Sequence, residues 1–198
     1  MAFSLAPVSS LTRLISTIIT LSVMAVFIAV LVDFVLYHSK NTVKKSKRSI
    51  VATGSMMGFY IVYYMVLRFQ LGSLFFVDIR VVALGTAMIA AGAVINILGR
   101  LQLQGNWANH IKIYQGHSLV NRGVYRIVRH PLYASIMLML LGGSLAYKNW
   151  LSAVLTLFVF VPFMHYRARQ EEALLQEEFL EYAEYKKTTG MFFPKLWR

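Results

Sequence analysis

Long apolar runs constrain this chain more than any other feature of its sequence. A helix needs about 20 apolar residues to cross the roughly 30 Å hydrocarbon layer of a bilayer. Five runs approach or exceed that length: Leu14–Tyr37, Ile50–Phe69, Val81–Leu98, Leu132–Tyr147 and Leu151–Tyr166. Because backbone polar groups find no water in that layer, the runs must be helical. We therefore predict an all-α integral membrane protein with about five transmembrane helices.

The last two runs are short, and only Lys148, Asn149 and Trp150 separate them. They predict a C-terminal helical hairpin that either spans a thin layer or re-enters it, with a kink at Pro162. From Arg167 onward, apolar residues recur at helical spacing among charges. This pattern predicts a separate cytoplasmic amphipathic helix. The first run is too long for a signal-peptide core and lacks a convincing cleavage site, so we expect it in the mature protein.

Two features inside the runs predict helix packing. Ala83, Ala87 and Ala91 recur every four residues and offer a small-residue face for a close helix neighbour. Asp33 and Asn96 are costly in lipid, so we expect them to face other helices.

The charge of the chain indicates a membrane surface. Lys and Arg outnumber Asp and Glu by 20 to 8, but 58% of the residues are hydrophobic, which favours anionic lipid over nucleic acid as the partner. The basic residues gather after the first run, in residues 99–130 and in the tail from Arg167. The positive-inside rule then places these segments and the C-terminus in the cytoplasm, and the N-terminus outside.

The polar stretch that ends in Arg129-His130-Pro131 leads directly into the fourth run. Pro131 suits the first turn of a helix, and the free N–H groups of such a helix start favour an anion. His130 could also be a simple capping or interfacial residue. The chain has no cysteine and no closely spaced histidine pair, so we expect no metal site. Its glycines form no nucleotide-binding loop, and no parallel-sheet fold fits.

Arg167 and Glu171 are four residues apart and therefore share one face of a helix. Glu172 lies about 100° further around the helix axis than Glu171. Taken alone, Arg167 and Glu171 could be a surface ion pair worth a few tenths of a kcal/mol. Their expected position directly after the last run and opposite the Arg-His-Pro stretch favours a functional site instead.

Several short motifs in the C-terminal half occur together in a fixed order. Arranged in this way, they resemble the isoprenylcysteine carboxyl methyltransferase family and its relatives among phospholipid methyltransferases. The matching pieces are Gly105-Asn106-Trp107, His117-Ser118-Leu119-Val120, Gly123-Val124-Tyr125, Arg129-His130-Pro131-Leu132-Tyr133, Glu171-Glu172 and Glu181-Tyr182-Ala183-Glu184-Tyr185.

The resemblance implies S-adenosylmethionine as cofactor and an amphiphilic, prenylated small molecule that enters from the bilayer. It implies that residues 1–98 give the lipid substrate access and that residues 99–198 are the catalytic half. Arg167 matches a position assigned to the substrate carboxylate, and with Glu171 it forms the expected catalytic pair. The implied cofactor-binding positions are His110, His117, Ser118, Leu119, Val120, Tyr125, His130, Pro131, Tyr133, Glu171 and Glu172. Tyr125 and Tyr133 could also be ordinary interface aromatics.

We therefore expect carboxyl O-methylation of an isoprenylcysteine-like acceptor. A phospholipid N-methyltransferase is the alternative enzyme, and it would need a base to deprotonate an ammonium acceptor. Membrane sterol reductases, which use a nicotinamide, have a related C-terminal half but longer chains. A non-enzymatic membrane scaffold would explain the apolar runs but not the clustering of the motifs.

Overall fold

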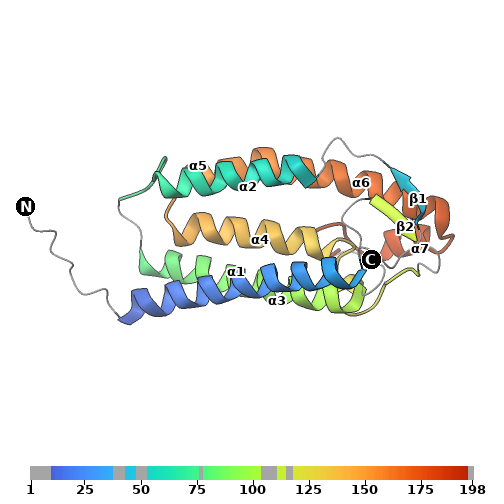
Figure 1. The fold of residues 1–198 in the computed structure, drawn as a ribbon, viewed down its shortest axis with the longest axis horizontal. Helices are drawn as coiled ribbons and strands as arrows, with labels where there is room; N and C mark the ends of the chain where they lie inside the picture. Colours follow the sequence, from blue (N-terminus) through green and yellow to red (C-terminus); the bar gives the residue numbers. More distant parts are fainter. Residues whose placement is uncertain are drawn as a thin grey trace, which may run out of the picture.

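The computed structural model describes residues 10–37, 43–47, 53–75, 78–103, 111–114 and 118–195. In these residues the chain forms a bundle of long helices that alternate in direction (Figure 1). The elements of the bundle are α1 (Ser10–Tyr37), α2 (Thr53–Arg68), α3 (Ile79–Leu103), α4 (Pro131–Ala146) and one long helix composed of α5 (Trp150–Leu155), the π-helical segment η3 (Thr156–Phe160) and α6 (Val161–Glu178). The predicted all-α integral membrane fold is confirmed.

Three of the described helices are long and apolar enough to cross a membrane, namely Ser10–Leu36, Ile79–Leu103 and Trp150–Glu178. Met56–Arg68 and Pro131–Ala146 are apolar but shorter. The 16 residues of α4 measure about 24 Å at 1.5 Å per residue. The expectation of a short hairpin therefore fits the first arm, whereas the second arm continues for 29 residues.

The polar tail differs from the expected separate surface helix. Arg167 lies inside α6, which continues the last apolar run as far as Glu178. The helix ends where Phe179 takes an extended conformation, and the short helix α7 (Tyr182–Thr188) follows. The irregularity expected at Pro162 takes the form of η3 directly before it, where the Val161 N–H bonds to the Thr156 carbonyl. Such π adjustments satisfy backbone groups near a proline that lacks a donor.

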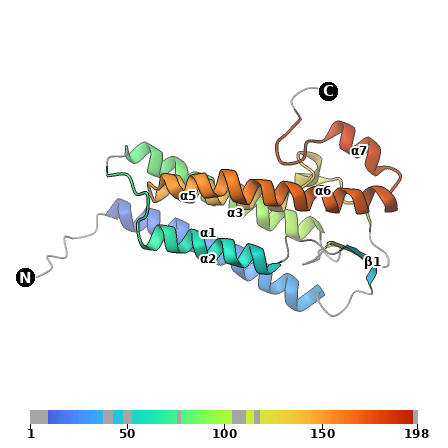
Figure 2. The same cartoon turned by 90° about the horizontal axis from the view of Figure 1, so that it is seen from above.

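Polar segments from distant parts of the chain gather at one end of the bundle. This end carries the start of α4, the last turns of α6, helix α7, the 3₁₀ turn η2 (Gly123–Arg126) and a two-stranded antiparallel sheet (Figures 1 and 2). The sheet pairs β1 (Val43–Lys47) with β2 (Ile111–Tyr114). The expectation that the basic segments share one side of the membrane agrees with this arrangement.

Helices α3 and α4 approach each other through glycines rather than through the expected alanine face. Ala83, Ala87 and Ala91 are exposed, whereas Gly85 and Gly142 are buried. A Cβ atom at Gly85 would lie 2.5 Å from the Gly142 carbonyl oxygen, and one at Gly142 would lie 2.6 Å from the Gly85 carbonyl oxygen. The two backbones are therefore in direct contact, and the alanine prediction was wrong.

Four polar side chains cross the interior of the bundle in a chain of contacts. Arg100 donates from Nη1 to Asp33 Oδ2 at 2.6 Å and from Nε to Asn96 Oδ1 at 2.8 Å. Asn96 Nδ2 in turn donates to Ser135 Oγ at 2.8 Å. The expectation that Asp33 and Asn96 face other helices is confirmed, since both are buried and the contacts join α1, α3 and α4.

Replacing Gly142 by alanine tests the α3–α4 contact. The added methyl group would overlap the Gly85 carbonyl, and overpacking of this kind costs about 1–3 kcal/mol. We expect a clear fall in the melting temperature of the detergent-solubilised protein. Gly58→Ala is the matched control, because nothing lies within 4 Å of its Cβ position. Equal melting temperatures for the two variants would contradict the close packing.

Candidate active site

The Arg-His-Pro stretch has a defined conformation before it enters α4. Gly123 begins η2 with a φ of +59°, a region that favours glycine. The next residue, Val124, donates its N–H to Gln102 Oε1 of α3 at 2.9 Å. Pro131 then occupies the first turn of α4, as predicted, while His130 stays outside helical geometry. The stretch is thereby fixed to α3 at one end and to α4 at the other.

The C-terminal segment holds this stretch from the opposite side. The backbone N–H groups of Arg129 and His130 donate to the carbonyl oxygens of Gly190 at 2.8 Å and Met191 at 3.0 Å. The Tyr185 hydroxyl of α7 donates to the Tyr125 carbonyl oxygen at 2.5 Å. Residues about 60 positions apart in the sequence therefore determine where the His130 ring lies.

Glu172 is a deeply buried carboxylate of this end, with 1% of its surface exposed. Its Oε1 accepts from Arg129 Nε at 2.8 Å and lies 3.3 Å from His130 Nε2. Its Oε2 lies 3.2 Å from Lys186 Nζ of α7. Arg129 also donates from Nη1 to the Lys186 carbonyl oxygen at 3.3 Å and to the Thr189 carbonyl oxygen. One carboxylate thus joins α6, α7 and the Arg-His-Pro stretch.

A second chain of contacts begins at Arg167. Its Nε donates to the Tyr133 hydroxyl at 3.0 Å, and that hydroxyl donates to Glu171 Oε2 at 2.9 Å. Arg167 Nη1 lies 3.6 Å from the Met56 sulfur of α2. His130 Nδ1 lies 3.8 Å from Glu171 Oε2. Arg167 and Glu171 therefore share a helix face, as expected, and the Tyr133 hydroxyl bridges them.

The two neighbouring glutamates differ in solvent exposure. The Glu171 side chain is 37% exposed, whereas that of Glu172 is 1% exposed. Glu171 is therefore the carboxylate that a ligand can reach, and Glu172 is occupied by its three cationic or imidazole neighbours.

Three aromatic rings pack together beside the two glutamates. The His130 and Tyr133 rings are stacked, with centroids 5.4 Å apart and planes 6° apart. The Phe192 ring meets His130 edge-on at 6.0 Å. These rings provide flat apolar surfaces beside the reachable carboxylate of Glu171.

The tyrosines of this end remain neutral. Burial raises the pKa of Tyr125 above its ordinary value of 10, and the nearby Glu171 carboxylate adds to the effect. Burial raises the pKa of Tyr182 as well, with Glu172 acting in the same direction. Both phenols stay protonated at neutral pH, so neither acts as a base there.

The structure brings together six of the predicted site residues: His130, Pro131, Tyr133, Arg167, Glu171 and Glu172. Tyr125 lies in η2 beside them. Ser118, Leu119 and Val120 precede η2, the first exposed and the other two half-buried. His110 and His117 lie outside the described residues.

Sequence reasoning missed the supporting residues. Arg129 was part of a matching motif but was assigned no role, although its position directly before His130 was a usable signal. Lys186, Met191 and Phe192 carried no comparable signal, because only tertiary contacts bring the C-terminal segment to His130.

Fold and site together define the class: an integral membrane protein with a charge-paired polar site at one end of a helical bundle. Comparison with known proteins gives the family. Residues 83–177 match the model of the isoprenylcysteine carboxyl methyltransferase family. The protein-S-isoprenylcysteine O-methyltransferase of Saccharomyces cerevisiae is 30% identical over 170 residues, which cover 79% of this chain and 68% of that protein. The chain belongs to the isoprenylcysteine carboxyl methyltransferase family.

Two other relatives match shorter regions. Protein-S-isoprenylcysteine O-methyltransferase A of Arabidopsis thaliana is 33% identical over 106 residues, 50% of this chain and 54% of that protein. The cobalt-zinc-cadmium resistance protein of Cupriavidus metallidurans is 37% identical over 90 residues, 45% of this chain and 41% of that protein. The chain therefore spans about half of these two relatives or less.

Glu172→Ala tests the buried carboxylate. It would leave Arg129 and Lys186 without their shared counter-ion, and removal of one partner from a buried ion pair costs about 3–5 kcal/mol. We expect a lower melting temperature and faster proteolysis after Lys186 and Lys187, because α7 loses its ion pair with α6. Glu177→Ala removes an exposed carboxylate of the same helix and should change neither. Proteolysis at the same rate in both variants would contradict the role of Glu172.

Proposed function

We propose that this protein transfers a methyl group from S-adenosylmethionine to the carboxylate of an isoprenylcysteine-like, lipid-attached acceptor. The observation that carries the proposal is the Arg167–Tyr133–Glu171 chain of contacts at the end of an apolar helical bundle. It places a cation suited to a carboxylate beside an accessible acid. The family membership and the names of the yeast and plant relatives support the same reaction.

The residues of the site suit the chemistry of this cofactor. Glu171 offers an accessible carboxylate to a positive sulfonium or to ribose hydroxyls. The half-buried rings of Tyr133 and Phe192, which both pack against the buried His130 ring, offer flat surfaces to a purine. When bound, S-adenosylmethionine supplies an electrophilic methyl group. Because Glu172 is enclosed by its ion pairs, we assign it to support Glu171 and His130 rather than to direct contact.

The acceptor decides what else the protein must provide. A terminal α-carboxyl group has a pKa of about 3.5, so it is ionised at neutral pH and needs no base. It does need a cation to hold it in line. A guanidinium can hold both oxygens of a carboxylate, which aligns the acceptor as well as attracting it.

Tyr133 restrains the guanidinium that would make this contact. Its hydroxyl accepts from Arg167 Nε, which fixes the orientation of the guanidinium, and Nη1 of that group lies toward Met56 of α2. When both reactants are held in the reactive orientation, the activation barrier can fall by up to about 7–11 kcal/mol. The Met56 contact places the same guanidinium where the N-terminal helices meet the C-terminal half. We accordingly propose that residues 1–98 admit the lipid and that residues 99–198 hold the cofactor.

Substitution of Arg167 tests the reaction. Arg167→Ala should lower kcat/KM by about 100-fold, which corresponds to about 2.7 kcal/mol and lies within the range of hydrogen bonds to charged groups. Binding of S-adenosylhomocysteine, measured by calorimetry, should stay nearly unchanged. Arg167→Lys should recover part of the rate, because an ammonium makes no paired contact.

Methyl ester formation from a prenylcysteine analogue and labelled cofactor is the readout for these variants. Arg80→Ala, which removes an exposed arginine at the other end of the bundle, is the control. An Arg167→Ala enzyme with full turnover would refute the carboxylate assignment. It would favour an amine acceptor, whose rate should rise with pH as the ammonium loses its proton.

We also propose that the polar end of the bundle faces the cytoplasm, with the N-terminus outside. The basic segments that gather at this end support that orientation through the positive-inside rule. A cysteine at Lys45 or Lys187 should react with an impermeant maleimide from the cytoplasmic side alone, and one at Arg80 from the opposite side alone. The chain has no cysteine of its own to interfere. Labelling of Lys45 and Lys187 from opposite sides would rule out the arrangement.

A further inference from the structure

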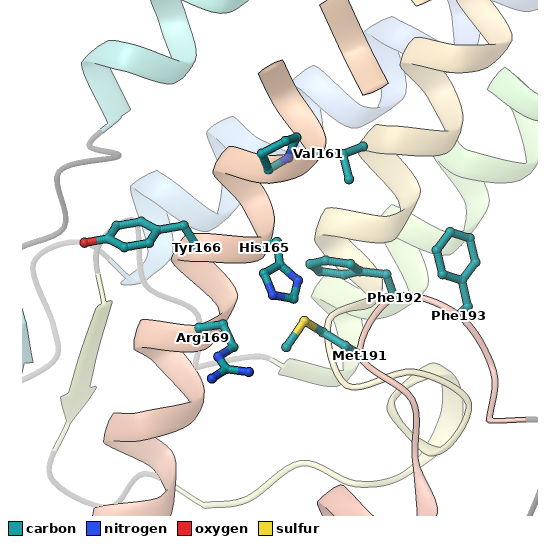
Figure 3. Close-up of a pocket in the computed structure, with 8 residues that line it drawn as sticks. Val161, His165, Tyr166, Arg169, Met191, Phe192 and Phe193 are labelled. Carbon is teal, nitrogen blue, oxygen red and sulfur yellow. The ribbon is translucent and has the colours of Figure 1, made fainter. Parts of the chain in front are cut away.

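An open groove runs along α6 outside the site described above (Figure 3). Its volume is about 950 Å³, and its walls are mostly apolar. Val161 and Pro162 line it from α6, and Met191 and Phe193 line it from the C-terminal segment. The groove therefore lies where the long apolar helix meets the chain that follows α7.

Phe192 separates the groove from the site. Its ring lies 6.2 Å from the His165 ring in the groove and 6.0 Å from the His130 ring in the site. Arg169 and Arg167 are two residues apart on α6, so their side chains point about 200° apart round the helix. A molecule in the groove would thus be separate from the acceptor and cofactor of the proposed reaction.

The chemistry of the groove changes in order along α6. It begins with Val161 and Pro162, continues with His165 and Tyr166, and ends with Arg169. Val161 and Arg169 are eight positions apart, which corresponds to about 12 Å along the helix. Figure 3 shows Arg169 at the end away from Val161, with the rings of His165 and Phe192 between them. A phospholipid has the same order of chemistry: an apolar chain, polar ester groups and then a charged phosphate.

Arg169 differs from the two arginines of the site, Arg129 and Arg167. Arg129 and Arg167 have hydrogen-bond partners in the site and are largely enclosed. Arg169 is exposed, and no hydrogen bond or ion pair joins it to another residue in the described part of the chain. Its guanidinium is free to hold two oxygens of an anionic group.

We propose that this groove binds one anionic phospholipid, with its phosphate on Arg169 and an acyl chain against Pro162 and Phe192. Charge complementarity supports this occupant, because the chain has a net charge of +12 and the groove ends in an arginine. The position supports it as well, since α6 leaves the apolar part of its span within the groove. Anionic headgroups gather at that level of a membrane.

Native mass spectrometry of the full chain in detergent, with defined lipid added, tests this site. We expect one phosphatidylglycerol to be retained in preference to phosphatidylcholine. Arg169→Gln should lower that preference by about fivefold, the effect of one basic residue near an anionic surface. Arg126→Gln is the control, because it removes an exposed guanidinium from η2 at the same end of the bundle. It should leave the preference unchanged.

Three results would overturn the proposal: equal retention of the two lipids, an equal loss in both variants, or full displacement of the lipid by inorganic phosphate. Displacement by a prenylcysteine analogue would also overturn it, because the groove would then belong to the acceptor. The readout is binding alone, so it does not depend on whether the proposed methyl transfer is correct.

Discussion

The polar end of this protein depends on one buried carboxylate. Glu172 lies within 3.3 Å of a basic nitrogen from the Arg-His-Pro stretch and of a second from α7, while it is itself part of α6. An ionised carboxylate with 1% exposure is stable only with such partners. Its burial therefore requires three separate segments to meet. That meeting places the His130 ring beside Glu171, the carboxylate that a ligand can reach.

Buried polar groups inside the bundle meet the same requirement. Asp33, Arg100, Asn96 and Ser135 satisfy one another across three helices, because lipid offers no alternative partners. The close α3–α4 contact continues at Gly92, where a Cβ would lie 2.8 Å from the Ser135 carbonyl oxygen, and one turn later Asn96 and Ser135 are within hydrogen-bond distance. Arg100 lies near the polar end of α3, so this interior chain of contacts continues toward the region where η2 rests on Gln102. Close helix packing and hydrogen bonds between buried polar side chains therefore both hold the helices that carry the site.

The two sides of α6 have different roles in our interpretation. One side carries Arg167 and Glu171 toward Tyr133, and it is on this side that we propose methyl transfer to a prenylated acceptor. The other side carries Arg169 toward lipid, with Phe192 between the two. A single helix that leaves the membrane thus offers a cation to an acceptor on one side and a cation to the bilayer on the other.

The sequence by itself determined the class of fold, since runs such as Val81–Leu98 can satisfy their backbone groups only as membrane helices. It also determined the start of α4 at Pro131, the inward position of Asp33 and Asn96, and the residues that meet around Glu171. Tertiary structure decided which small residues pack, because glycine and alanine patterns overlap along a helix and only the neighbour's position distinguishes them. It also decided that α6 continues past Arg167 and that Lys186 and Phe192 complete the site. The contacts of His130 with Glu172 and with Phe192 join residues 42 and 62 positions apart, and Lys186 joins α7 to α6. No local sequence pattern encodes contacts between residues so far apart in the chain.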